Sequence, residues 1–448
     1  MGYIFKAKDG RPLTRPISYP ATDEQVYNQL KSLADDGLIT VSAGGGKSSG
    51  ITISGMPKFY VNGDLTGISK ENPKNATFVF EYGNVIKTGT VNIKWQGTSS
   101  LMYPKKNYTI KLFYDKKRKN KCKLNFNGWG EQNKFCLKAN YIDHSHARNI
   151  VSAKLWGDIV ATRKNTAPTK LGEAPNFGAI DGFFIQMYIN GDYQGLYTWN
   201  IPKDGWMFNM DKEDGTESVL CGENFYSGCF VEPPVIDGSD WSLEYPDDLS
   251  PEISASWKNA IQFVIAADDT IFTRDVENYF DLQSLIDYYI FAVVSCGIDS
   301  MGKNQLFVTY DNGKTWVASM YDMDSTWGLY WDGGHFIPAT SVCQDDYESM
   351  NSGMGHPADG NRLYNLLVAN FWGEICARYT ELRASVFDAD YIKLRFNNFW
   401  QYTTDAMFAE DVVINPYIPQ KNVDFKSQIE DFIDDRLDYT DSFFVEGE

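Results

Sequence analysis

The middle of this chain places two acidic sites on either side of a predicted hairpin. A strongly apolar stretch at 282–295 predicts a buried helix, and it leads directly into Asp299, which begins an Asp-x-x-x-x-Asn pattern ending at Asn304. Two apolar runs follow, separated by turn residues at 311–314, and they predict the two strands of a hairpin. The second run ends in Asp322-Met323-Asp324. A helix, an acidic loop, a hairpin and an acidic pair therefore follow one another in a fixed order.

Protein kinases use the same order of parts, and the chemistry of phosphoryl transfer explains each part. One carboxylate accepts the proton of the attacking hydroxyl, and Asp299 is the candidate for this role. An amide oxygen and a second carboxylate hold the Mg²⁺ ions that bridge the phosphates of ATP, which makes Asn304 and Asp322 candidate metal ligands. Asp324 is a candidate second ligand or outer partner, and Lys303 is a candidate to neutralise the transferred phosphoryl group.

Each of these residues also has a structural interpretation. Asp299 is compatible with a turn at the end of the preceding helix, Asn304 with the start of a strand, and Lys303 with plain exposure to solvent. If Asp322-Met323-Asp324 is extended, both carboxylates project from the same face. That geometry also suits the Asp-x-Asp metal site of many glycosyltransferases, and an exposed structural pair is the third interpretation.

Composition excludes several other classes of protein. The chain has 448 residues, of which 43% are hydrophobic and 15% aromatic, so we expect a packed globular protein with one large domain and appendages or with two to three domains. Its net charge of −18 argues against a partner that is nucleic acid or a membrane surface. No apolar run is long enough to span a bilayer, and the N-terminal residues lack the apolar centre of a signal peptide. We therefore expect synthesis in the cytoplasm.

The cysteines and histidines do not indicate a zinc site. Seven cysteines are scattered without a Cys-x-x-Cys motif, and only four histidines are present, so we expect free thiols and no structural zinc. No ligand spacing on a predicted helix joins the four histidines, which we interpret as surface or packing residues: His144, His146, His335 and His356.

The pattern of elements predicts an α+β fold in three regions. Residues 1–50 are an appendage, with a short helix at 22–34 and then a glycine- and serine-rich linker. Residues 51–200 are predicted to be rich in strands. Residues 201–448 are predicted to be mostly helical and contain the acidic block at 299–328.

Strand and helix signals give approximate bounds within these regions. Strands are predicted at 58–61, 77–82, 89–95 and 108–113, and a hairpin at 183–189 and 195–199. Helices are predicted at 144–161, 253–267, 363–379, 390–409 and 425–443. The acidic segment at 205–250 is rich in Gly, Asp and Pro and is predicted to be an irregular insertion.

Several segments carry a family resemblance. They occur in this order: 93–100 (IKWQGTSS), 103–111 (YPKKNYTIK), 137–143 (LKANYID) with Arg148-Asn149, 188–197 (YINGDYQGLY), and the acidic block. Each segment by itself is weak evidence for a family. Together, over about residues 55–445, the segments resemble the CotH family of atypical protein kinases, which is named for a spore coat protein. The resemblance implies a kinase-like fold, with a β-rich N-terminal lobe and a helical C-terminal lobe. It also implies phosphoryl transfer from ATP to a protein hydroxyl with Mg²⁺.

The resemblance adds a phosphate-binding loop and a lysine. Gln96, Gly97, Thr98 and Ser99 lie where a loop covering the nucleotide is expected, because glycine allows close approach and hydroxyl and N–H groups bind phosphate oxygens; an ordinary β-turn is the alternative.

A dense run of lysines at 105–123 is interpreted as a solvated hairpin edge, with an anion site at its first three lysines as the alternative. Within it Lys111 resembles the strand lysine that reaches the α- and β-phosphates, and Lys106 competes for the role because the register is open. Asp143 and Arg148 are interpreted as a structural pair.

A second hypothesis is a structural component that keeps a kinase-like fold with little or no activity. The appendage at 1–50 would suit an anchor that docks the main domain onto a larger complex. Spore coats are one such setting, and phage tails and baseplates are another, by analogy only. The partner is then an assembly component of a coat or virion instead of a protein substrate.

Overall fold

The structure is a computed structural model that describes residues 4–7, 39–42, 50–163, 167–224, 230, 235–300, 303–341 and 361–445. Of the predicted N-terminal appendage it describes two short strands, β1 (Ile4–Ala7) and β2 (Ile39–Ser42), which pair antiparallel. The predicted helix at 22–34 and residues 43–49 of the linker lie outside the described residues.

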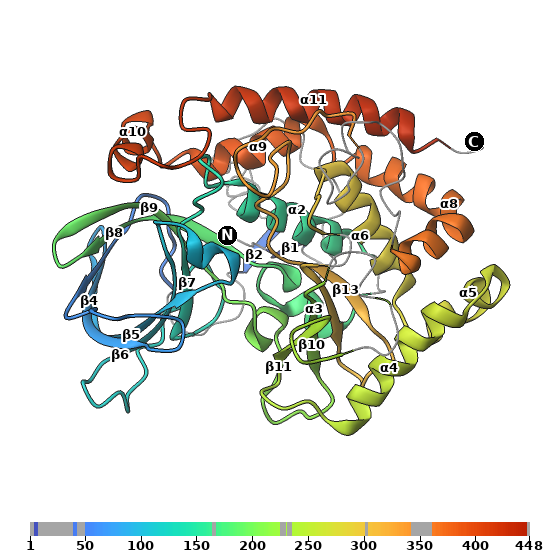
Figure 1. Ribbon diagram of the computed structural model, residues 1–448, viewed down its shortest axis with the longest axis horizontal. Helices are drawn as coiled ribbons and strands as arrows, with labels where there is room; N and C mark the ends of the chain where they lie inside the picture. Colours follow the sequence, from blue (N-terminus) through green and yellow to red (C-terminus); the bar gives the residue numbers. More distant parts are fainter. Residues whose placement is uncertain are drawn as a thin grey trace.

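A closed barrel forms the first half of the molecule (Figure 1). Its strands are β3 (Lys58–Asn62), β4 (Lys74–Tyr82), β5 (Val85–Gln96), β6 (Asn107–Phe113), β7 (Lys134–Lys138), β8 (Gly182–Ile189) and β9 (Asp192–Asn200). They are joined in the order β3-β4-β5-β6-β7-β9-β8, and the parallel pair β3 and β8 closes the ring. The strands predicted before residue 114 and the hairpin are confirmed, whereas neither the closure nor β7 was predicted.

Aromatic side chains fill the barrel. Trp199 on β9 is fully buried, and its ring lies 5.0 Å from that of Phe135, 5.1 Å from that of Phe59 and 5.6 Å from that of Phe80. Along β6 buried residues alternate with less buried ones, so one face of the strand lines the barrel and the other faces outward. The outward face of β7 carries Lys134, Cys136 and Lys138.

A four-stranded sheet lies in the second half of the molecule. It contains β10 (Ser218–Gly222), β11 (Trp241–Tyr245), β12 (Gln305–Thr309) and β13 (Val317–Met320), in the order β11-β10-β12-β13. The predicted hairpin is confirmed, because β12 and β13 pair antiparallel. The prediction of an irregular insertion at 205–250 is wrong, since β10 and β11 lie within it; β10 pairs with the distant β12, and local sequence does not reveal such a partner.

Helices surround this sheet and complete an α+β fold, as predicted (Figure 1). They are α2 (Arg148–Thr162), α3 (Thr169–Glu173), α4 (Pro251–Ala266), α5 (Asp269–Asp275), α6 (Leu282–Ser295), α8 (Arg362–Arg383), α9 (Ala389–Trp400), α10 (Asp405–Ile414) and α11 (Phe425–Phe443). The helix predicted at 390–409 is two helices, because Thr404 caps a new N-terminus by accepting a hydrogen bond from the amide of Met407. Within the described residues, no helix is long and apolar enough to cross a membrane.

Candidate functional site

Asp299 and Asn304 contact each other at the start of β12. Asn304 Nδ2 donates hydrogen bonds to the Asp299 backbone oxygen at 3.2 Å and to Asp299 Oδ2 at 3.0 Å. Lys303 Nζ lies 3.7 Å from the same Oδ2. The backbone amide of Asn304 donates to Gly222 at the end of β10, which fixes the loop to the sheet. The predicted Asp-x-x-x-x-Asn pair is therefore brought together.

Asp322 and Asp324 follow β13 in a turn. Asp322 has a φ of 55°, so the segment is not extended, and the condition under which alternation would direct both carboxylates to one face is not met. Between them Met323 is buried, and its amide donates to Asn149 Oδ1 at 3.1 Å. Helix α2 therefore holds the backbone of the acidic turn while both carboxylates stay partly exposed.

The carboxylates of the two acidic sites interact electrostatically. Burial raises the pKa of Asp324 well above its usual range, and the negative charges of Asp322, Asp143 and Asp299 raise it further, against the effect of Lys138. Burial also raises the pKa of Asp299 to about 6, with Lys303 opposing and Asp322 adding to the rise. Carboxylates that destabilise one another's charge in this way form a site suited to a cation.

Lys138 on β7 is the cation that sequence analysis missed. Its Nζ lies 3.8 Å from Asp322 Oδ1 and 5.8 Å from the centre of the Tyr321 ring. Burial works against the charge of Lys138, but the carboxylates of Asp322 and Asp324 raise its pKa above the usual value. The sequence signal was available, because Lys138 ends a short alternating run that begins at Lys134, and this run was not predicted as a strand.

The two lysines predicted to contact phosphate are elsewhere. Lys111 is exposed on β6 and pairs in register with Lys134, while Tyr108 pairs with Leu137. Lys138 therefore lies opposite the start of β6, about 13 Å along the strand from Lys111. Burial and the charges of Lys134 and Lys94 lower the pKa of Lys111.

Lys106 is partly buried, and its side chain bonds back to the backbone of the loop that precedes it. Its Nζ donates to the backbone oxygens of Leu101 at 2.6 Å and of Tyr103 at 2.5 Å, and it lies 5.1 Å from the centre of the Trp95 ring. The structure therefore brings neither of the two predicted lysines to the acidic turn.

The predicted glycine loop lies between β5 and β6. Gly97 has a φ of 117°, and a Cβ there would lie 1.9 Å from Ser100 Oγ, so a side chain at this position would be strained. Thr98 and Ser99 are exposed. Gln96 ends β5, and its buried Oε1 has no hydrogen-bond partner among the described residues.

Two contacts join this loop to the region of Lys138 and Asp324. Asn107 Nδ2 donates to Ser100 Oγ at 3.3 Å, and Asn107 Oδ1 accepts a hydrogen bond from the Ala139 amide at 2.7 Å, one residue after Lys138. Burial raises the pKa of Tyr103, and the charge of Asp324 raises it further. The glycine loop and the acidic turn therefore border the same region of the molecule.

A buried network of polar side chains holds the backbone of the turn that carries Asp322 and Asp324. Arg148 Nη1 lies 2.5 Å from Asp143 Oδ1, which confirms the predicted pair. Arg148 Nε also donates to the Thr326 backbone oxygen at 3.0 Å, and its Nη2 donates to Gln428 Oε1 on α11. Gln428 Nε2 in turn donates to the Trp327 backbone oxygen at 3.2 Å. Residues from α2 and α11 therefore fix the turn that carries Asp322 and Asp324.

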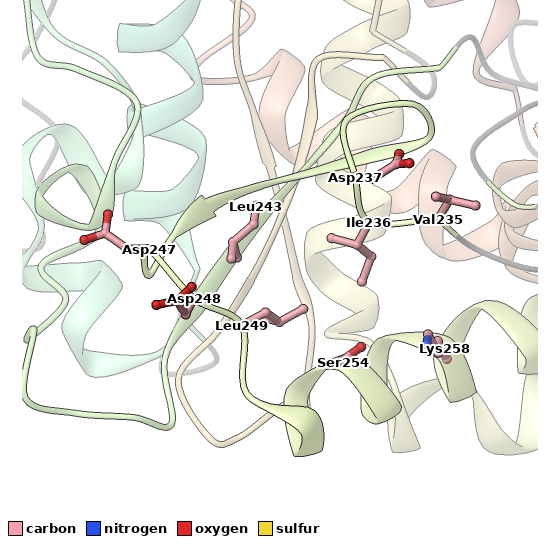
Figure 2. Close-up of a pocket in the computed structure, with 9 residues that line it drawn as sticks. All are labelled: Val235, Ile236, Asp237, Leu243, Asp247, Asp248, Leu249, Ser254 and Lys258. Carbon is pink, nitrogen blue, oxygen red and sulfur yellow. The ribbon is translucent and has the colours of Figure 1, made fainter.

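Two other groups of polar residues lie outside this site. Asp237, Asp247 and Asp248 surround a pocket beside α4 that has apolar side chains and none of the predicted site residues (Figure 2). Cys221, Glu223 and Glu244 lie close enough together to hold a metal, but Lys203 Nζ already lies 2.8 Å from Glu244 Oε1. Neither group adds a residue to the acidic site.

The remaining cysteines and histidines agree with the sequence analysis as far as they are described. Cys229, Cys343 and His356 lie outside the described residues, and the cysteines within them form no disulfide. His144 is a buried packing residue, His146 is buried with its Nε2 3.2 Å from Asp411 Oδ2, and His335 is exposed with its Nδ1 2.5 Å from Asp332 Oδ2.

Comparison with known proteins identifies the family. The family model described as CotH kinase protein matches residues 93–440, which is most of the chain and includes every predicted site residue. No curated protein matches the chain. The chain belongs to the CotH kinase protein family.

Proposed function

We propose that this protein is a protein kinase that uses Mg²⁺ and ATP to phosphorylate a hydroxyl group of a polypeptide. The observation that carries the proposal is that Asp299, bonded to Asn304, lies within electrostatic range of Asp322 and Asp324, and that Lys138 pairs with Asp322. In this proposal the barrel serves as the N-terminal lobe of a kinase-like fold, and the helices around the four-stranded sheet serve as the C-terminal lobe. Family membership supports it independently.

The donor atoms at the acidic turn fit magnesium. The carboxylates of Asp322 and Asp324 and the side-chain oxygen of Asn304 are hard oxygen ligands, which Mg²⁺ prefers. Asn304 Nδ2 is committed to Asp299, so its Oδ1, which accepts no hydrogen bond from the described residues, is the atom left for a cation. When bound, Mg²⁺ would neutralise charge on the phosphate oxygens of ATP.

The chain's own residues supply the other functions. Asp299, held by Asn304 and Lys303, would accept the proton of the acceptor hydroxyl as the new oxygen–phosphorus bond forms and the bond to the ADP oxygen breaks. Lys138 would contact the phosphates, in the role that the family resemblance implied for Lys111 or Lys106. The backbone amides and hydroxyls of Thr98 and Ser99 would cover them from the opposite side.

Thermal unfolding with Mg²⁺ and ATP tests the nucleotide site. Binding at about a hundredfold excess over Kd adds about 2.7 kcal/mol to the stability of the folded state, enough to raise the unfolding midpoint visibly. We expect this shift in the wild type and in Asp247→Ala, a matched control from the pocket of Figure 2, but not in Asp322→Ala. No shift in any of the three proteins would overturn the proposal, and a shift with a UDP-sugar and Mn²⁺ but not with ATP would support a glycosyltransferase.

Transfer is tested separately from binding. With ATP labelled in the γ-phosphoryl group and a library of hydroxyl-bearing peptides, we expect Asp299→Asn to bind nucleotide as the wild type does but to lose transfer. Equal transfer by Asp299→Asn and Asp322→Ala at the wild-type rate would show that the roles of these two residues are assigned wrongly.

A further inference from the structure

Asp411 on α10 is a fully buried carboxylate surrounded by hydrogen-bond donors from distant parts of the chain. Lys105 Nζ donates to its two oxygens at 2.8 and 3.0 Å, the Leu196 amide donates at 3.1 Å, and Asn415 Nδ2 donates at 3.0 Å. His146 Nε2 lies 3.2 Å from its Oδ2. One side chain of α10 is thereby joined to β9, to the segment before β6 and to the turn before α2.

The surroundings keep Asp411 charged. Burial alone would raise its pKa, but Lys105 and His146 bring it well below the usual range. Gly195 makes the close approach possible: it has a φ of 101°, and a Cβ there would lie 1.8 Å from Asp411 Oδ1. A charged carboxylate taken from water is costly unless it is paired and hydrogen-bonded, so this arrangement is a specific one that most substitutions would disrupt.

Lys105 connects this carboxylate to the glycine loop. It stands at the end of the segment that follows Gly97, and besides Asp411 its Nζ donates to the Leu196 backbone oxygen at 2.6 Å. The next residue, Lys106, closes the same segment onto Leu101 and Tyr103. The pairing of Gln96 with Asn107 holds the two ends of the loop together, and the buried ion pair of Lys105 with Asp411 on α10 anchors the loop at a further point, outside the hairpin.

We propose that Asp411 is a positioning residue for the glycine loop: through Lys105 it holds residues 97–106 in place over the nucleotide site. The part of this inference that concerns nucleotide rests on the proposed function, but the ordering of the loop does not. Because a binding loop gains affinity when its bound conformation is preformed, loss of Asp411 weakens nucleotide binding without removing any group that touches the nucleotide.

Hydrogen exchange without nucleotide tests the ordering directly. We expect Asp411→Asn to speed exchange of the amides at 97–106 by about tenfold or more, because the segment opens locally when its anchor is lost. The matched control is Asp287→Asn, since Asp287 on α6 is also fully buried and paired with two arginines, Arg163 and Arg378. In the control we expect faster exchange in the helices around α6 and not in the glycine loop.

Nucleotide binding gives the second readout. In Asp411→Asn we expect the Kd and KM for ATP with Mg²⁺ to rise about tenfold while the rate at saturating ATP is retained, which a general loss of stability would not produce. If Asp411→Asn does not fold, Asn415→Ala removes one donor to the same carboxylate and should have a smaller effect in the same direction. Unchanged exchange at 97–106, or equal acceleration in Asp411→Asn and Asp287→Asn, would overturn the proposal. Altered exchange in a protein that binds no nucleotide would keep the positioning role and reject the proposed function.

Discussion

The barrel and the acidic turn are held together by different forces. Inside the barrel, Trp199 and its neighbouring phenylalanines pack ring against ring with few directed contacts. The acidic turn at 322–327 is instead held by hydrogen bonds that Arg148 and Gln428 donate and that Asn149 accepts. One region depends on the amount of apolar surface buried, and the other depends on individual polar partners.

This difference predicts two kinds of response to substitution. Apolar burial is non-directional, so a small loss of volume in the barrel costs a small amount of free energy and leaves the arrangement intact. A buried polar group that loses its partner keeps its full desolvation penalty. The region that carries the candidate catalytic residues is therefore expected to be the more sensitive one, and pairs of substitutions test this, starting with the largest effect.

Arg148→Met should cause the largest loss. It leaves Asp143 as a buried charge without its cation and removes a donor from the Thr326 oxygen, so we expect a loss of about 3–5 kcal/mol in the free energy of unfolding. Urea unfolding followed by fluorescence measures it. Arg274→Met is the control, because Arg274 pairs with Asp275 at the exposed surface and its loss should leave the midpoint unchanged. Similar effects of the two substitutions would show that the burial of the Arg148 ion pair does not determine the loss of stability.

The buried side chain of His144, in the turn that joins the two regions, is expected to make the stability of the folded protein depend on pH. Its ring is buried against Phe408 and Phe425, and neither ring nitrogen has a partner among the described residues. Burial lowers the pKa of His144 to about 4, with the positive charge of His146 adding to the effect. The unfolded chain therefore binds a proton at a higher pH than the folded protein does. The free energy of unfolding therefore carries no penalty from His144 above about pH 6.5. It falls by up to about 3 kcal/mol as the pH falls toward 4.

Unfolding by urea at pH 7, 6 and 5 measures this dependence. We expect His144→Leu to lose less stability over that range than the wild type, whatever its stability at pH 7. His335→Gln is the matched control, because His335 is exposed beside Asp332 and its replacement should keep the wild-type slope. A slope in His144→Leu equal to that of the wild type would show that other groups titrate.

The sequence predicted the acidic block well because its parts are local. The apolar helix, the loop from Asp299 to Asn304 and the hairpin are each specified by neighbouring residues, and the structure confirms all three. What the sequence could not give is the direction of Asp322, whose positive φ depends on tertiary contacts of the turn.

The errors concern residues whose partners are distant in the sequence. The family resemblance points to Lys111, with Lys106 as the alternative, whereas β7, the short strand that ends at Lys138, was not predicted. When the barrel closes, β7 pairs with β9 and Lys138 lies beside Asp322. Asp411 was missed for a related reason, because the split of the predicted helix at 390–409 and the pairing with Lys105 are both tertiary effects.

Lys138→Met and Lys111→Met test this correction. Lys138 lies beside Asp322, so we expect its replacement to weaken binding of ATP with Mg²⁺ about tenfold or more, which corresponds to about 1.4 kcal/mol. Lys111 is exposed on β6, and its replacement should leave Kd unchanged. Titration calorimetry on both variants measures the difference. The reverse result would return the phosphate-binding role to Lys111 and would place the nucleotide along β6.

Ile93→Val and Ser152→Ala make the closest comparison between the two regions. Ile93 is fully buried in the barrel, and its substitution removes one methyl group at a cost of about 0.5–1.5 kcal/mol. Ser152 on α2 is also fully buried and accepts a hydrogen bond from Trp327 Nε1 at 2.9 Å, so Ser152→Ala removes one hydroxyl at a cost of about 1–3 kcal/mol.

We expect both variants to fold and only Ser152→Ala to reduce the thermal shift caused by ATP with Mg²⁺. The reason is that Trp327 is the last residue of the acidic turn, whereas the methyl group of Ile93 contributes only to packing. If Ile93→Val reduced the shift as much as Ser152→Ala did, the barrel core and the acidic turn would have to respond as one unit.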